Sequence, residues 1–261
     1  MQIFETIQLL QFENLLKFKN IIHFSTTRTG GFSKNHLAGF NLGYTVGDKP
    51  KNVTQNLELL AVILDIEKRQ LVSPKQTHSK NIGIVTSPKD AFPDTDALIT
   101  NIPGICLFVR TADCVPILLY DPVQEAVAAI HSGWKSTLQE ISKHTIDLMQ
   151  NAFGTQPENI IAGIGPSIGP DVYEVGPEVV EQFKNHFTFD NYITPVKNSD
   201  KGLLNLWKIN HQILIDSGVP KEQIEVAGMC TYSNPDLFYS ARRDGVKCGR
   251  LATGIMLKDK K

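Results

Sequence analysis

Cysteine is scarce in this chain and never occurs as a closely spaced pair. No Cys-x-x-Cys is present, and the four cysteines stand far apart: Cys106, Cys114, Cys230 and Cys248. A small disulfide-stabilised fold needs a higher density of cysteines, and a zinc ribbon needs close pairs. Both are therefore excluded, and we expect reduced thiols. Cys106 lies inside an apolar run and fits a buried core position, whereas Cys114 follows Asp113 in a turn.

Long apolar runs and an excess of charge of one sign are also missing. The longest apolar runs, such as residues 115–120, are far too short to span a bilayer. The N-terminus has neither a basic opening nor a small-residue cleavage site, so we expect a cytoplasmic protein with no membrane partner. Lys and Arg number 26 against 27 Asp and Glu, so no broad basic surface for nucleic acid is expected. Any anion must be bound by local groups.

Three common enzyme motifs are absent as well. The sequence has no Gly-x-Ser-x-Gly nucleophile elbow and no Walker P-loop. The glycine-rich stretch 163–169 contains Pro166 and has the wrong glycine spacing for a dinucleotide fingerprint. A serine hydrolase, a P-loop enzyme and a Rossmann dehydrogenase are therefore not indicated.

Short apolar segments alternate with helical patterns along the chain. Segments rich in β-branched residues predict a central sheet with strands at 71–73, 82–86, 97–100, 105–110, 115–120 and 126–130, and further strands are predicted at 21–25, 160–164 and 224–229. Apolar residues at helical spacing predict helices at 50–64, 137–153, 178–187 and 204–217. No repeat or long flexible linker divides the chain, so we expect one mixed α/β domain spanning residues 1–261.

Three residues combine the chemistry of a metal site: His78, Cys114 and His131. Each lies in a polar turn beside an apolar run, where open α/β sheets place their ligand-binding residues. One thiolate and two imidazoles favour zinc, with copper as the competitor. Catalytic zinc sites use three protein ligands plus water, so this set would leave an open position. The separations along the chain match no defined ligand motif, and the sequence alone leaves the convergence of the three side chains undecided.

Arginines in turn-rich segments form a second signal. Arg28 stands beside a double glycine, and Arg242, Arg243 and Arg250 cluster near the C-terminus. Guanidinium groups suit phosphate or carboxylate ligands, because their planar fork matches two oxygens at once. For Arg243 an exposed turn paired with Asp244 is the better interpretation. Arg28, Arg242 and Arg250 remain as candidate anion-binding residues.

Short motifs recur from one end of the chain to the other: Ser-Thr-Thr-Arg-Thr-Gly-Gly-Phe-Ser (25–33), Asn-Leu-Gly-Tyr-Thr-Val-Gly-Asp (41–48), Gln-Thr-His-Ser (76–79), Thr-Ala-Asp-Cys-Val-Pro (111–116), His-Ser-Gly-Trp (131–134), Gly-Pro-Ser-Ile-Gly (165–169), Tyr-Glu-Val-Gly (173–176) and Phe-Tyr-Ser-Ala-Arg-Arg-Asp-Gly (238–245). Together they resemble the laccase-domain family, also called the purine nucleoside phosphorylase-like or peptidoglycan editing factor family. The resemblance implies an α/β sandwich in which helices flank a mixed central sheet. It also implies a metal site at His78, Cys114 and His131. Three residues depart from the usual pattern of this family. Ser132 stands where the pattern has Ala, and Lys135 and Leu57 stand where it has Arg.

The resemblance implies several candidate activities. We expect foremost a zinc-dependent purine nucleoside phosphorylase, which converts adenosine, inosine, guanosine or methylthioadenosine and phosphate into a free base and a pentose 1-phosphate. The same pocket is expected to deaminate adenosine. The alternatives are a copper-dependent polyphenol oxidase and an amidase that edits peptidoglycan precursors with Cys114 as its nucleophile. For the oligomeric state we expect a monomer or a small homo-oligomer.

The leading hypothesis assigns a role to each candidate residue. The metal ligands are also the catalytic groups, and Arg28, helped by Arg242 or Arg250, holds phosphate near the sugar. Asp113, which precedes Cys114, is assigned as an orienting residue or a base. Gln76 and Asn41 are assigned as contacts to the purine or the ribose.

Overall fold

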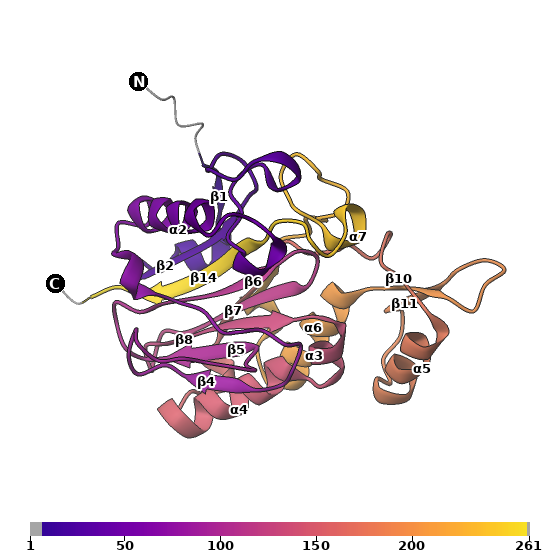
Figure 1. Cartoon of the computed structure of the whole chain (residues 1–261). Helices are drawn as coiled ribbons and strands as arrows, with labels where there is room; N and C mark the ends of the chain where they lie inside the picture. The colour runs from indigo at the N-terminus through magenta and orange to yellow at the C-terminus, as the bar shows by residue number, and fades with distance from the viewer. Residues whose placement is uncertain (1–6, 260–261) are drawn as a thin grey trace.

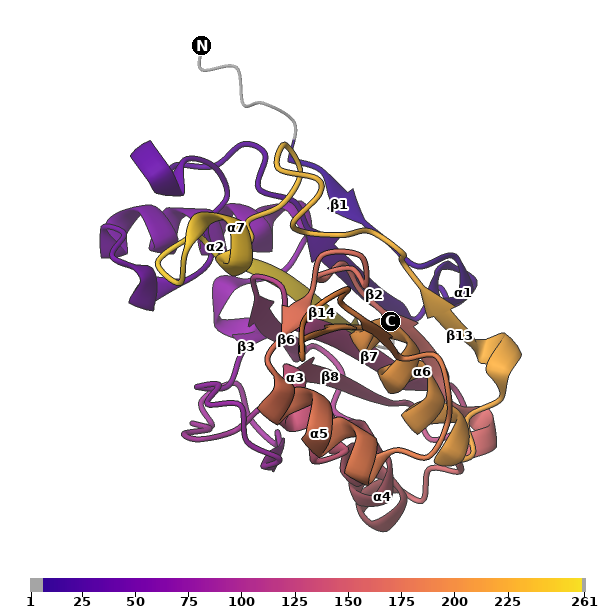
Figure 2. The same ribbon diagram turned by 90° about the vertical axis from the view of Figure 1, so that its right-hand side faces the viewer.

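The chain forms two β-sheets that pack face to face, with helices on both outer faces (Figure 1). The computed structural model describes residues 7–259. Helix α2 (Pro50–Ile63) covers the outer face of one sheet, whereas α4 (Ile141–Phe153) and α6 (Leu206–Asp216) cover the outer face of the other. A quarter turn shows α2 and α4 on opposite sides of the strands (Figure 2). This mixed α/β sandwich confirms the predicted fold class.

The first sheet has five strands in the order β1-β2-β14-β6-β3. Neighbouring strands are antiparallel except for β3 and β6, which are parallel. Alternate residues of β6 face opposite layers, since Leu107 and Val109 pack between the sheets while Cys106 and Phe108 pack toward α2. The strand bounds are Leu9–Leu10 (β1), Ile21–Thr26 (β2), Leu251–Leu257 (β14), Cys106–Thr111 (β6) and Leu71–Val72 (β3).

The second sheet has six strands in the order β13-β9-β7-β8-β5-β4. The two outer pairs, β13 with β9 and β4 with β5, are parallel, and the central pairs are antiparallel. Strands β7 and β8 are buried along their whole length, so they form the centre of the molecule. The strand bounds are Ile224–Val226 (β13), Ile161–Ile164 (β9), Val115–Asp121 (β7), Ala126–Ser132 (β8), Ala97–Thr100 (β5) and Ile82–Ile84 (β4).

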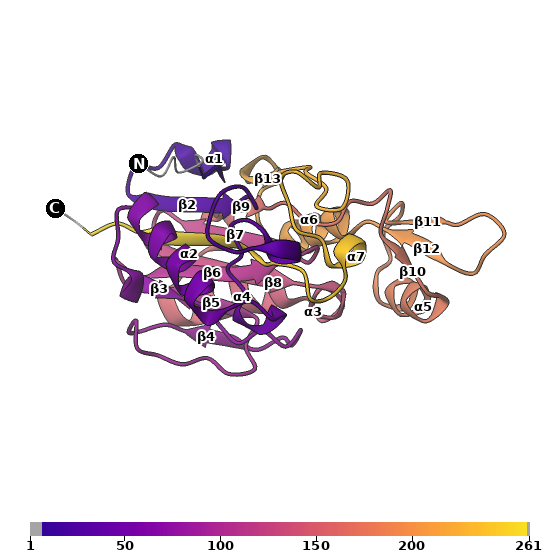
Figure 3. The same ribbon diagram turned by 45° about the horizontal axis from the view of Figure 1, so that its top comes forward.

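A small third sheet projects from this body beside helix α5 (Pro177–His186), as Figure 3 shows. Its strands are β10 (Glu174–Val175), β12 (Gly202–Leu204) and β11 (Ile193–Pro195), all antiparallel. The loop between β11 and β12 is polar and largely exposed. The remaining helices are α1 (Glu13–Leu16), α3 (Trp134–Leu138) and α7 (Ala241–Asp244). Among residues 7–259 no helix has the length and apolar character needed to cross a membrane.

Three details of the predicted secondary structure are wrong. The strands at 71–73 and 105–110 belong to the first sheet, not to one central sheet with the others, because sheet membership depends on long-range pairing. The helix expected at 137–153 is broken between α3 and α4, where Glu140 has a φ of 52°. Strand β14 was not predicted: it is buried on both faces, so its residues do not alternate between apolar and polar.

Candidate metal centre

The pairing of β7 with β8 brings two of the three candidate ligands together. Pro116 of β7 lies opposite His131 of β8, so Cys114, which directly precedes β7, lies beside the imidazole. His78 comes from the loop between β3 and β4. Its ring centre lies 4.8 Å from that of His131, with the rings at 71°. Three segments that are far apart in the sequence therefore converge at one end of the central strands.

The donor atoms of this trio have the spacing of a metal site. All three lie within 4.8 Å of one another, and Cys114 Sγ lies 3.6 Å from His78 Nε2. A sulfur and a nitrogen bound to one tetrahedral zinc ion are about 3.5 Å apart, given bond lengths of about 2.3 and 2.0–2.1 Å. His131 is buried, Cys114 is half-buried and His78 is exposed, so the site is open on one side.

Gly133 keeps the space between the ligands free. A Cβ at this position would lie 2.7 Å from His78 Cδ2 and 3.1 Å from Cys114 Sγ. The φ of Gly133 is −71°, a value that other residues also adopt. Glycine is therefore required here because there is no space for a side chain, not because of the backbone conformation. This cradle, together with the donor set, fits a metal ion bound by two imidazoles and one thiolate.

Two ligand-bearing turns have left-handed backbone. His78 has a φ of 63° and Asp113, next to Cys114, has a φ of 92°. Such conformations cost roughly 1–3 kcal/mol each in residues other than glycine and cluster at functional sites. The Asp113 carboxylate holds its turn by accepting three hydrogen bonds, from the Thr231 hydroxyl, the Ser240 hydroxyl and the main-chain N–H of Arg242.

The electrostatics of the trio favour a thiolate. Burial opposes ionisation of Cys114, but the charges and hydrogen bonds of His131 and His78 outweigh it and lower the pKa of Cys114 to about 6. Burial also opposes protonation of His131, but the Cys114 thiolate and Asp96 outweigh it and raise the pKa of His131. The thiolate is the form that binds metals, and a metal cation can take over the positive charge beside it.

Sequence reasoning missed Asp96, which directly precedes β5. Its carboxylate is fully buried and lies 2.7 Å from Nδ1 of His131. It also accepts hydrogen bonds from the main-chain N–H groups of Thr77, His78 and Ser79. One acidic residue among many gives no signal in the sequence, because its contacts depend on the pairing of β5 with β8.

The structure connects Arg242 to the trio through Asp113, the residue before Cys114. The Asp113 carboxylate accepts a hydrogen bond from the main-chain N–H of Arg242 at 2.7 Å. The Arg242 guanidinium stacks on Tyr173, 5.1 Å from the ring centre, and donates to the carbonyl of Glu174. Burial and the nearby charge of Cys114 raise the pKa of the Tyr173 hydroxyl, which therefore stays a donor. Tyr173 lies in one of the sequence motifs but was not predicted as a site residue.

The two other candidate arginines contact main-chain carbonyls. The Arg28 guanidinium stacks on Tyr239 at 4.7 Å and donates to the carbonyl of Pro235. The Arg250 guanidinium donates to carbonyls in its own segment, those of Val246, Cys248 and Gly249.

Asn41 and Gln76 use their side chains within the protein. The Asn41 amide donates to Asp48 and its oxygen accepts from the main-chain N–H of Arg250. The Gln76 amide pairs with both the N–H and the carbonyl of Arg110. Asn41 therefore holds its own segment to that of Arg250, and Gln76 holds the loop that carries His78 to the end of β6.

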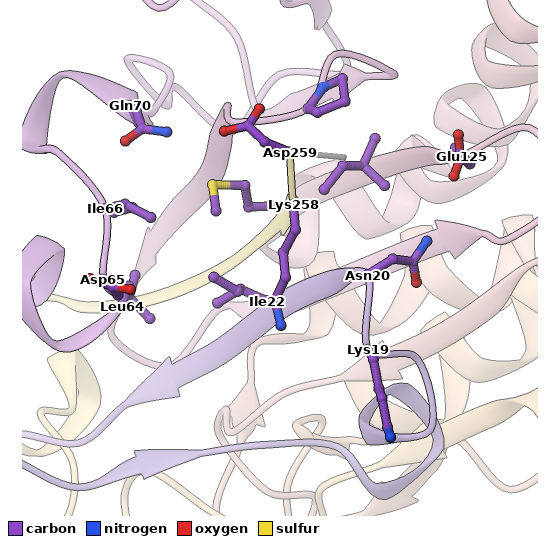
Figure 4. A pocket seen from close by; sticks show the side chains of 13 residues that line it. Lys19, Asn20, Ile22, Leu64, Asp65, Ile66, Gln70, Glu125, Lys258 and Asp259 are labelled. Carbon is purple, nitrogen blue, oxygen red and sulfur yellow. The ribbon is translucent and has the colours of Figure 1, made fainter. Parts of the chain in front are cut away.

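A separate cavity is lined in part by Glu125, which lies in the loop joining the far ends of β7 and β8 (Figure 4). Its volume is about 790 Å³, and it opens between the end of α2 and the ends of β2 and β14. The residues that line it include Ile22, Leu64, Lys258 and Asp259, and none of the candidate site residues is among them. The metal centre and this cavity are therefore distinct features.

The chain is similar to known proteins over nearly its whole length. Residues 22–258 match the family described as multi-copper polyphenol oxidoreductase laccase. A purine nucleoside phosphorylase of Bacteroides thetaiotaomicron is 40% identical over 260 residues, which cover 96% of this chain and 96% of that protein. The adenosine deaminase RL5 of an unknown prokaryotic organism is 36% identical, covering 90% of this chain and 93% of its own.

A solved structure shows the same fold. The crystal structure of the hypothetical protein YfiH from Bacillus licheniformis superposes with a TM-score of 0.91 at 33% identity, covering 97% of this chain and 98% of that one. Both the matched family and these relatives span almost the whole chain. The chain therefore belongs to the multi-copper polyphenol oxidoreductase laccase family, the laccase-domain family that its motifs resemble.

Proposed function

We propose that this chain is a zinc-dependent purine nucleoside phosphorylase that also deaminates adenosine. The convergence of His78, Cys114 and His131 carries the proposal, in a chain that is similar over most of its length to a protein of that name. In phosphorolysis a phosphate oxygen bonds to C1′ of the pentose, the bond from C1′ to the purine nitrogen breaks, and the base leaves with a proton. The expected partners are a purine nucleoside and inorganic phosphate.

The three ligands favour zinc and leave one position for water or substrate. Bound zinc would polarise a substrate oxygen or lower the pKa of its water to about 7. Cys114 supplies a thiolate at neutral pH, because its pKa is lowered. His131 is held from behind by Asp96, so its other nitrogen points toward the shared space. Gly133 keeps that space open.

Arg242 is the residue that we assign to phosphate, with Arg28 as a second contact. The Arg242 side chain lies over Tyr173, and its main-chain N–H donates a hydrogen bond to Asp113, the residue before Cys114. A guanidinium in this place can bind two phosphate oxygens, and the protonated Tyr173 hydroxyl can donate a hydrogen bond to the nucleoside. We assign the remaining predicted contacts, Arg250, Asn41 and Gln76, to holding the loops around the substrate.

Deamination of adenosine is a second activity for the same site, favoured by the similarity to a protein named adenosine deaminase. Water would add to C6 of the purine and ammonia would leave, giving inosine. A water activated by zinc at the open coordination position would suit this reaction, because deamination is a hydrolysis.

Two other activities have less support. Among residues 7–259 only one group of three His, Cys, Asp or Glu side chains has metal-binding spacing, whereas a multicopper oxidase needs further copper sites. A cysteine amidase would need Cys114 free to attack a carbonyl, but Cys114 lies among nitrogen donors with ligand spacing.

Product analysis tests the proposal. Zinc-loaded protein is incubated with adenosine, with and without phosphate, and adenine and inosine are separated by chromatography. Adenine that appears only with phosphate supports the phosphorylase, whereas inosine alone makes the protein a deaminase. If neither product forms, and ammonia or an amine is released from a muropeptide precursor, the amidase replaces the proposal.

A further inference from the structure

We propose that Asp96 is the positioning residue that assembles the metal centre, because its single carboxylate fixes both histidine ligands. It holds His131 by the ring and His78 by the backbone of its turn. The inference rests on the metal site of the proposed function. It can be tested without any substrate.

The contact with His131 sets the direction of that ligand. Oδ1 of Asp96 lies 2.7 Å from Nδ1, and both side chains are buried. A carboxylate accepts hydrogen bonds, so the proton lies on Nδ1 and the lone pair of Nε2 is directed away from Asp96. Carboxylate–histidine–metal arrangements of this kind fix the tautomer and the ring orientation of a ligand.

The contact with the 77–79 turn sets the position of His78. Three successive N–H groups point at the same carboxylate, at 3.1 Å from Thr77, 3.0 Å from His78 and 2.7 Å from Ser79. The Ser79 hydroxyl adds a bond of 2.8 Å. Such a concave row of N–H groups is an anion-binding nest. Here the anion belongs to the protein, and it stabilises the left-handed conformation of His78.

The main chain of Asp96 reinforces the same geometry. Its carbonyl accepts the N–H of His131 at 2.7 Å, and the next residue, Ala97, pairs with Ile130. The register of β5 against β8 therefore places Asp96 beside His131 through main-chain contacts alone. Two ligands from distant parts of the chain are joined through this one residue.

A role in proton transfer does not fit Asp96. The side chain has no solvent exposure, and its two oxygens already accept five hydrogen bonds of 3.1 Å or less. No lone pair is left for a substrate proton. A charged group buried in this way is tolerated only when its partners satisfy it, so the carboxylate and the nest stabilise each other.

The test measures zinc affinity of the Asp96→Asn variant by competition with a chromophoric chelator. The amide puts N–H groups where the nest already donates, so we expect zinc to bind about 10–100-fold more weakly. With Co²⁺ as the probe, the thiolate-to-metal absorption band should weaken or shift. Wild-type affinity together with a wild-type Co²⁺ spectrum would overturn the inference.

Asp94→Asn is the matched control. Asp94 lies beside the same turn, where its side chain accepts from the Thr77 hydroxyl and from the Asn81 amide, but it contacts neither histidine. We expect this variant to bind zinc within about threefold of the wild type. An equal loss in both variants would show that any change in the turn weakens the site and would contradict a special role for Asp96.

A second variant keeps the test decisive if Asp96→Asn fails to fold. Ser79→Ala removes one of the bonds to the carboxylate and leaves the backbone nest in place. We expect zinc binding to weaken by a few-fold, and unchanged binding would count against the inference. If wild-type protein binds zinc as expected but releases no base from nucleosides, the proposed function fails while the role of Asp96 stands.

Discussion

Val115 lies opposite Ser132 in the antiparallel pair of β7 and β8. The residues just outside this pair, Cys114 and Gly133, therefore meet at the end of the two strands, and a Cβ on Gly133 would lie 3.1 Å from Cys114 Sγ. Two strands that are buried along their whole length thus define the position of the Cys114 thiol. This relation makes the site sensitive to single methyl groups.

Gly133→Ala should abolish zinc binding without unfolding the protein. The added methyl group would occupy the space between His78 and Cys114, where the ion is expected. Gly202→Ala is a matched control, because its Cβ would also meet a side chain at 2.7 Å, that of Ile193 in the projecting sheet. Metal content after dialysis against zinc compares the two. A Gly133→Ala protein that keeps its zinc would contradict the cradle.

Arg242→Ala should raise the KM for phosphate and leave the KM for the nucleoside nearly unchanged. A hydrogen bond to a charged group contributes about 1.5–3 kcal/mol, which corresponds to roughly a 10–100-fold loss of phosphate binding. The main-chain bond to Asp113 persists in this variant, so the Cys114 turn is retained. Arg69→Ala, which removes an exposed arginine paired with Glu67, is the control. Equal phosphate KM values in both variants would exclude Arg242 from phosphate binding.

Asp113→Ala should destabilise the protein. Two hydroxyl groups and one N–H would lose a buried acceptor, and each unsatisfied group costs about 1–3 kcal/mol. We expect the free energy of unfolding in urea to fall by about 3 kcal/mol, with zinc affinity falling in parallel because the Cys114 turn is loosened. A variant with wild-type stability and zinc content but no turnover would instead support a role for Asp113 as a catalytic base.

His23 should make the protein less stable in mild acid. Burial lowers the pKa of His23 to about 4, and the neutral ring accepts the N–H of Phe12. The unfolded chain takes up a proton near pH 6.5 and the folded protein does not, so the stabilising effect is complete above pH 6.5 and is lost as the pH falls toward 4.

A His23→Gln variant measures this effect. Glutamine keeps an acceptor for Phe12 but does not titrate. Between pH 7 and pH 5 we expect the wild type to lose about 2 kcal/mol more free energy of unfolding than the variant. Parallel pH profiles in urea denaturation would show that His23 does not contribute.

The three candidate ligands could be selected from the sequence because each is a reactive residue in a turn beside a buried strand, and the structure brings their donor atoms together. The helix covering the first sheet was predicted for a similar reason, since Pro50 at its start and the apolar spacing that follows are local signals. The same holds for the overall class, because apolar segments and helical patterns alternate along the chain. Local patterns thus predict which helices and strands are present and which residues are candidates for the site.

Features set by long-range pairing could not be predicted. Asp96 lies beside His131 because β5 pairs with β8, and the division of the strands into two sheets depends on partners far along the chain. The main-chain N–H of Arg250 donates a hydrogen bond to the Asn41 side chain, and no local pattern in the sequence indicates this contact. Glu140 breaks the predicted helix with a backbone conformation that its residue type does not favour.

The central claim is that His78, Cys114 and His131 form one zinc site that supports phosphorolysis. The most direct measurement determines zinc content and phosphate-dependent release of adenine in the same preparations of wild-type and Cys114→Ala protein. We expect bound zinc and adenine release in the wild type and the loss of both in the variant. A Cys114→Ala protein with full zinc content and full activity would contradict the account.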